Sequence, residues 1–148
     1  MIHKNQVKLM AAITFAAVMP LLAGGFYLEI GNPSANSDPK AKDALFVVRA
    51  TGCHEPEKAS FTATAEGKVN GKRESVPLKL VPLSQTGSYA IRRDFPAEGR
   101  WVVTVAGVST VGAVTSVAVP IKEKGFDRAS IKFVQGKLVR EDVEEMIR

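Results

Sequence analysis

Apolar and polar residues alternate along much of the chain from residue 44 onward. The alternation is cleanest at 60–66, where polar residues separate Phe61, Ala63 and Ala65. A period of two places every second side chain on the same face of a β-strand, so this segment predicts a strand with one buried face. Further strands are predicted at 44–50, 76–80, 89–95, 101–105, 114–121 and 131–133.

Glycine and proline residues separate these segments and favour turns. Asn70 and Gly71 form the strongest hairpin signal, because both tolerate the positive φ angles of a two-residue turn. Pro77 and Pro82 cannot donate ladder hydrogen bonds, so the strand at 76–80 is expected at a sheet edge or at a bulge. Short strands at this spacing, with no long helical pattern between them, predict an all-β fold, an immunoglobulin-like antiparallel β-sandwich of about seven strands.

The end of the chain has a helical pattern. Val139, Val143, Met146 and Ile147 fall at positions i, i+4, i+7 and i+8, which places them on one side of a short helix. A helix of two or three turns is marginal in water by itself, so it must dock on a surface. We expect it to pack on its own sandwich; docking on a partner protein is the alternative.

The beginning of the chain predicts export. Residues 9–28 carry no charge and follow Lys4 and Lys8. Such a segment is typical of a signal peptide or of a single membrane anchor whose basic side stays in the cytoplasm. Small residues from Ala23 onward suit cleavage before Phe26, whereas a retained segment of this length can span a bilayer. The protein is therefore predicted to be extracytoplasmic (periplasmic or at the cell surface), either secreted or anchored by one N-terminal helix.

Composition divides the chain into three regions. Residues 1–30 are predicted as the signal peptide or transmembrane anchor. Residues 31–43 are rich in Pro, Ser, Asn and Asp, which is typical of a flexible linker with nothing to bury. Residues 44–148 are predicted to form the β-sandwich domain with its short C-terminal helix.

Charge and cysteine content exclude two classes of protein. The chain has 20 basic and 15 acidic residues, and the two signs are interspersed. The pairs Lys72-Arg73 and Arg92-Arg93 are interpreted as solvent-exposed strand and turn positions, so no basic stripe indicates nucleic-acid binding. A single cysteine, Cys53, cannot form an intrachain disulfide. The hydrophobic core must therefore stabilise the fold by itself.

Cys53 and His54, followed by Glu55 and Glu57, form the one cluster of reactive residue types in the predicted domain. Neighbours on a strand point to opposite faces, so Cys53 and His54 could share a metal ion only from a turn. A zinc or copper site normally needs three or four protein ligands, and a cysteine nucleophile needs a base at hydrogen-bonding distance. We therefore expect no metal, no cofactor and no catalytic residue. Cys53 is expected at the rim of the sandwich, as a slow-reacting thiol or in a disulfide-linked homodimer.

Two consecutive strands carry a family resemblance. Gly87-Ser88-Tyr89 opens one strand, and Gly99-Arg100-Trp101 opens the next, which continues as Val-Val-Thr-Val. This pattern, within residues 77–106, resembles small exported bacterial sandwich domains of the FixH and YtkA-like type, and also transthyretin-like modules. The resemblance implies the sandwich fold, and some members of that group act beside copper enzymes or in membrane complexes. Copper handling in such proteins relies on His and Met, of which the predicted domain holds His54 and Met146.

These observations favour a non-enzymatic extracytoplasmic interaction or accessory module. It would be held at or near the membrane by its N-terminal segment, and it would bind an unidentified protein partner and no nucleic acid. The alternative is an envelope metal-handling protein for copper or zinc that uses Cys53 and His54.

Overall fold

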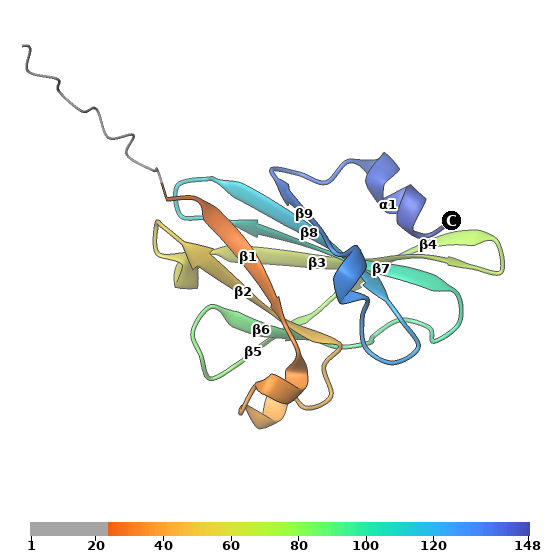
Figure 1. The fold of residues 1–148 in the computed structure, drawn as a ribbon, viewed down its shortest axis with the longest axis horizontal. Coiled ribbons are helices and arrows are strands. Elements are labelled where there is room, and N and C mark those ends of the chain that lie inside the picture. The colour runs from red at the N-terminus through yellow and green to blue at the C-terminus, as the bar shows by residue number, and fades with distance from the viewer. Residues whose placement is uncertain (1–23) are drawn as a thin grey trace, which may run out of the picture.

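Two antiparallel sheets face each other in the computed structural model, which describes residues 24–148 (Figure 1). In this part of the chain the four-stranded sheet has the order β1-β2-β6-β5 and the five-stranded sheet the order β4-β3-β7-β8-β9. The strands are β1 (Phe26–Gly31), β2 (Phe46–Gly52), β3 (Ser60–Val69), β4 (Lys72–Leu78), β5 (Leu80–Pro82), β6 (Ser88–Ile91), β7 (Arg100–Val108), β8 (Val114–Ile121) and β9 (Lys132–Gln135). One helix, α1 (Arg140–Met146), follows β9. The predicted all-β sandwich is confirmed, with nine strands in residues 24–148 where about seven were expected.

The core lies between the two sheets and is formed by the alternate positions that the sequence predicted. Ala63 and Ala65 of β3 face it beside Val103 and Val105 of β7, and all four are buried. Trp101 at the start of β7 is 3% exposed, and its ring lies 4.8 Å from that of Phe95. Within the five-stranded sheet, the small side chains of β3 thus lie beside β-branched side chains of β7.

The turn and edge predictions are confirmed. Asn70 and Gly71 have φ angles of 48° and 78° and join β3 to β4. Pro77 lies in β4, at one edge of the five-stranded sheet, and Pro82 lies in β5, at one edge of the four-stranded sheet. The single strand predicted at 76–80 is in fact two strands separated by Lys79, since the chain passes there from one sheet to the other.

The first strand corrects the predicted domain boundary. Residues 26–30 were assigned to the signal or anchor segment, yet they lie in β1 and pair with β2. Phe26, Leu28 and Ile30 are buried in the core, while Tyr27 and Glu29 face outward. The period of two was hidden because these residues continue a long apolar run.

β1 is an edge strand, and side chains from the C-terminal third of the chain cover part of its free edge. The Thr115 hydroxyl donates to the Phe26 carbonyl oxygen at 2.6 Å, and the Arg128 guanidinium donates to the Ile30 carbonyl oxygen at 3.2 Å. Covering of this kind opposes pairing with a strand from another molecule.

Residues 31–43 form a docked segment instead of the predicted flexible linker. They contain two 3-10 turns, at Pro33–Ala35 and Pro39–Ala41, and Ala41 is fully buried beside Val47. The Asp38 carboxylate accepts hydrogen bonds from the Ser84 hydroxyl and from the backbone N–H of Ser84 and Lys40. These bonds, that of the Ser84 hydroxyl first, lower the pKa of Asp38 to about 2. The segment therefore belongs to the folded domain.

The remainder of the predicted signal or anchor helix falls in residues 1–23, which lie outside the described residues. From residue 24 to the C-terminus, no helix has both the length and the apolar character that a membrane crossing requires.

Candidate functional site

Cys53 and His54 lie together in a left-handed turn that follows β2. Gly52, His54 and Glu55 all have positive φ angles there, of 106°, 66° and 51°. Cys53 is exposed and unpaired, in agreement with the predicted position at the rim. Its backbone N–H donates to the Gly25 carbonyl oxygen at 3.2 Å, so this turn lies beside the start of β1.

The turn does not gather further metal ligands. Glu55 pairs with Lys58, and the His54 carbonyl oxygen accepts a hydrogen bond from the Thr110 hydroxyl at 3.0 Å. Across residues 24–148, no group of three or more His, Cys, Asp and Glu side chains is placed so that it could hold a metal ion. Cys53 and His54 are therefore sequence neighbours in this turn, to which residues 24–148 add no third ligand.

A groove of about 720 Å³ lies on the outer face of the five-stranded sheet, beside α1. Its floor consists mainly of small and hydroxyl-bearing side chains from β3, β7 and β8, and its wall is formed by the segment that leads into α1 and by the first turns of α1. We call it the C-terminal groove. Its floor includes Thr62, Thr64, Thr104, Ala106 and Ser116, and its wall includes Lys137, Leu138, Val139, Arg140 and Val143.

The helix α1 packs on the same outer face. Val143 and Ile147 are 6% and 1% exposed, and Ile147 packs with Val102 of β7 and Ala118 of β8. The predicted apolar stripe is therefore mostly confirmed, and it docks on its own domain as expected. Val139, the first residue of the stripe, is instead 54% exposed.

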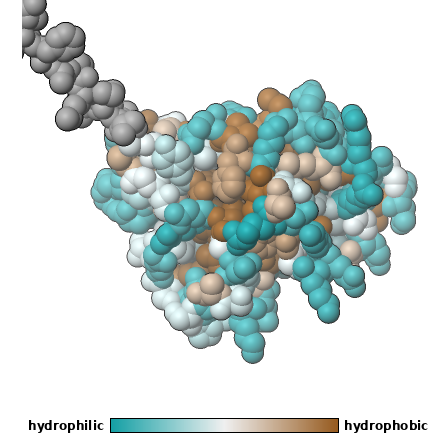
Figure 2. Space-filling view, viewed as in Figure 1, coloured by the Kyte–Doolittle hydropathy of each residue, from teal (hydrophilic) through white to brown (hydrophobic). Residues whose placement is uncertain are grey.

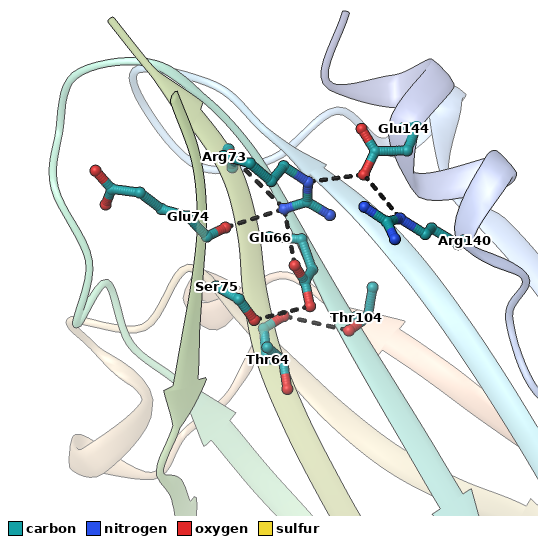
Figure 3. Close-up of polar contacts among 9 residues, drawn as sticks. Thr64, Glu66, Arg73, Glu74, Ser75, Thr104, Arg140 and Glu144 are labelled. Atoms are coloured by element: carbon teal, nitrogen blue, oxygen red, sulfur yellow. Dashed lines mark hydrogen bonds and ion pairs between the residues drawn. The ribbon is translucent and has the colours of Figure 1, made fainter. Parts of the chain in front are cut away.

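An ion-pair network connects β3, β4 and α1 beside the groove, whose lining includes Glu66 and Arg73 (Figure 3). Arg73 reaches across the sheet from β4 and contacts Glu66 of β3 and Glu144 of α1, each at 2.8 Å. The hydrogen bond from Arg73 lowers the pKa of Glu144 below its usual value. The Lys72-Arg73 pair was interpreted as solvent-exposed; no local signal showed that Arg73 would connect β4 with the C-terminal helix.

Farther along β7 from this network, the groove has exposed apolar residues. Val108 and Val139 line it and are 38% and 54% exposed, and the exposed Val111 lies in the turn between β7 and β8. Exposed apolar residues that cluster beside a hollow are typical of contact surfaces.

A second, smaller hollow of about 450 Å³ lies along β1. Leu28, Ile30 and the half-exposed Phe133 contribute apolar surface to it. Figure 2 shows hydrophobic residues gathered in the middle of this view of the molecule, with hydrophilic residues around them. The Ser88 hydroxyl, which also belongs to this hollow, is buried and has no hydrogen-bond partner within the described part of the chain.

Comparison of the chain with protein families, with curated proteins and with solved structures finds no match. The resemblance of residues 77–106 to FixH and YtkA-like domains therefore stays a prediction.

Proposed function

We propose that this protein is a non-enzymatic, immunoglobulin-like interaction module outside the cytoplasm, held at or near the membrane and acting by contact through the C-terminal groove. The observation that carries the contact role is the groove itself. It combines about 720 Å³ of open space with exposed valines in its lining. Surfaces with these properties are common at sites of protein contact.

The charge pattern at the start of the chain supports the location. Lys4 and Lys8 precede the uncharged segment, which favours retention of that end in the cytoplasm. Since β1 begins at Phe26, the predicted cleavage point coincides with the start of the first strand. A retained anchor would have residues 9–25 to cross the membrane, which is ~26 Å as a helix and close to the lower limit for a bilayer.

Reporter fusions test the location. Because β1 precedes the segment 31–43, the reporter belongs after Arg148, where it leaves every described strand intact. Alkaline phosphatase, which folds only outside the cytoplasm, should be active in this fusion, and β-galactosidase should be inactive. Active β-galactosidase with inactive phosphatase would place the domain in the cytoplasm.

Site-specific photo-crosslinking tests the contact. A photoreactive phenylalanine at Val139 lies on the groove wall, and the same group at Tyr27, which is 51% exposed on the other sheet, is the matched control. In cells that make the protein, light should produce a discrete adduct from position 139 and none from position 27. The absence of any adduct from position 139 would reject the groove as the contact surface.

A further inference from the structure

The helix α1 shows which kind of ligand the outer face of the five-stranded sheet accepts. Val143 and Ile147, four residues apart, bury their side chains on this face, and Leu138 and Met146 pack around Ile147. On the sheet side, the buried cluster that contains Ile147 is formed by Val102 and Ala118. This face is therefore already a surface for an amphipathic helix with apolar residues at i and i+4.

The same surface continues beyond α1. Along β7, the outward positions after Val102 are Thr104, Ala106 and Val108, and all three line the C-terminal groove. On β8, Ser116 and Val114 continue the surface next to Ala118. α1 has only seven residues and leaves this part uncovered. The groove is thus an extension of an existing helix-docking surface.

The groove lining holds three basic side chains, Arg73, Lys137 and Arg140, and two acidic ones, Glu66 and Glu74. Ion pairs join Arg73, Lys132 and Arg140 to acidic residues of the domain and leave Lys137 out. The pair of Arg140 with Glu144 is long, at 3.7 Å, and the Arg140 side chain is 81% exposed. Figure 3 shows that the carboxylate of Glu74, across the groove, points away from α1. The positive charge of Lys137 at the wall, which no ion pair within residues 24–148 engages, favours acidic residues on the ligand.

We infer that the C-terminal groove binds an amphipathic helix of a partner protein, with apolar residues at i and i+4 and acidic residues on its flank, alongside α1. This inference rests on the proposed function and specifies the partner. The apolar side chains of the partner lie on Ala106 and Val108 and against Val139, and its acidic residues face Lys137 and Arg140.

The experiment uses the full chain with the photoreactive group at Val139 and identifies the crosslinked segment by mass spectrometry. The segment should have the amphipathic, acidic pattern, and a synthetic peptide of that segment should become helical when it binds the protein. Lys137→Glu should lower the crosslinking yield roughly fivefold or more, whereas the matched change Lys124→Glu, in an exposed loop outside the groove, should not.

Each other outcome overturns the inference. A lipid adduct, a second copy of this chain, a basic or extended segment, or a yield that is insensitive to Lys137→Glu would contradict a helical acidic partner while leaving contact at the groove intact. The absence of any adduct at position 139 would instead reject the proposed function itself.

Discussion

Replacement of Trp101 by alanine should remove most of the stability of the domain. A buried tryptophan removes ~150–250 Å² from water, which at ~25 cal/mol per Å² corresponds to ~4–6 kcal/mol. Trp101 is 3% exposed, and its indole N–H donates to the Glu98 carbonyl oxygen at 2.8 Å. Measured aromatic-to-alanine changes in cores cost ~3–5 kcal/mol, and we expect a loss near the upper end of that range. Trp101→Phe, which keeps most of the contact and loses the hydrogen bond, should cost ~1–2 kcal/mol.

A variant at a neighbouring position tests the contact beneath the Trp101 ring. A Cβ atom at Gly67 would lie 2.3 Å from the Trp101 ring, so Gly67→Ala should displace the indole and cost ~1–3 kcal/mol. Gly31→Ala is the control, because its Cβ would meet nothing closer than 3.9 Å. Urea unfolding followed by far-UV circular dichroism measures all four variants. A loss below ~1 kcal/mol for Trp101→Ala would refute the assignment of this residue to the core and would restore a binding role for it.

Three further predictions concern the helix, the docked N-terminal segment and the thiol. Ile147→Ala should lower the free energy of unfolding by ~2–3 kcal/mol, because it removes the side chain that packs α1 on the sheet. The control Glu141→Ala, at an exposed position, should change the free energy of unfolding by less than ~0.5 kcal/mol. Equal losses in the two variants would contradict the docking of α1. The Asp38 carboxyl should titrate near pH 2 by NMR. Since its folded pKa lies below the unfolded value, its contribution to stability is present above about pH 4 and is lost as the pH falls toward 2. Titration near pH 4 would contradict its hydrogen bonds to the turn before β6. The exposed Cys53 should react fully with a thiol reagent in the native protein, or the protein should run as a disulfide-linked dimer on a non-reducing gel. Neither form should contain stoichiometric metal. One tightly held copper or zinc per chain, lost in both Cys53→Ser and His54→Ala, would establish metal handling instead.

The features that could be predicted from the sequence are those set by local chemistry. The hairpin at Asn70 and Gly71 needs only residues that tolerate positive φ, and the prolines in β4 and β5 are excluded from central strands by their missing N–H groups. The strand at 114–121 was predicted with the bounds of β8, because Gly112 and Pro120 lie at its two ends in an otherwise β-branched run.

The features that the sequence did not reveal depend on distant contacts. β1 was missed because its alternation begins inside a longer apolar run, where the stronger signal of a membrane segment prevails. Docking of residues 31–43 depends on the packing of Ala41 against buried residues of β2 and β6. It also depends on the hydrogen bond that Asp38 accepts from Ser84. The C-terminal groove exists because α1 covers only part of the sheet, and the ion-pair network beside it requires Arg73 to meet Glu144, 71 residues away.

The free edge of β1 can be covered only after the C-terminal third of the chain has been synthesised. The Ile30 carbonyl oxygen accepts its hydrogen bond from Arg128, which follows it by 98 residues. At a synthesis rate of ~5–20 residues per second, roughly 5–20 s pass before that side chain leaves the ribosome. Throughout this interval the Ile30 carbonyl oxygen lacks the hydrogen bond from Arg128, and an uncovered strand edge favours pairing with another chain. A chaperone that shields residues 26–31 of the emerging chain until Arg128 has left the ribosome would therefore oppose aggregation.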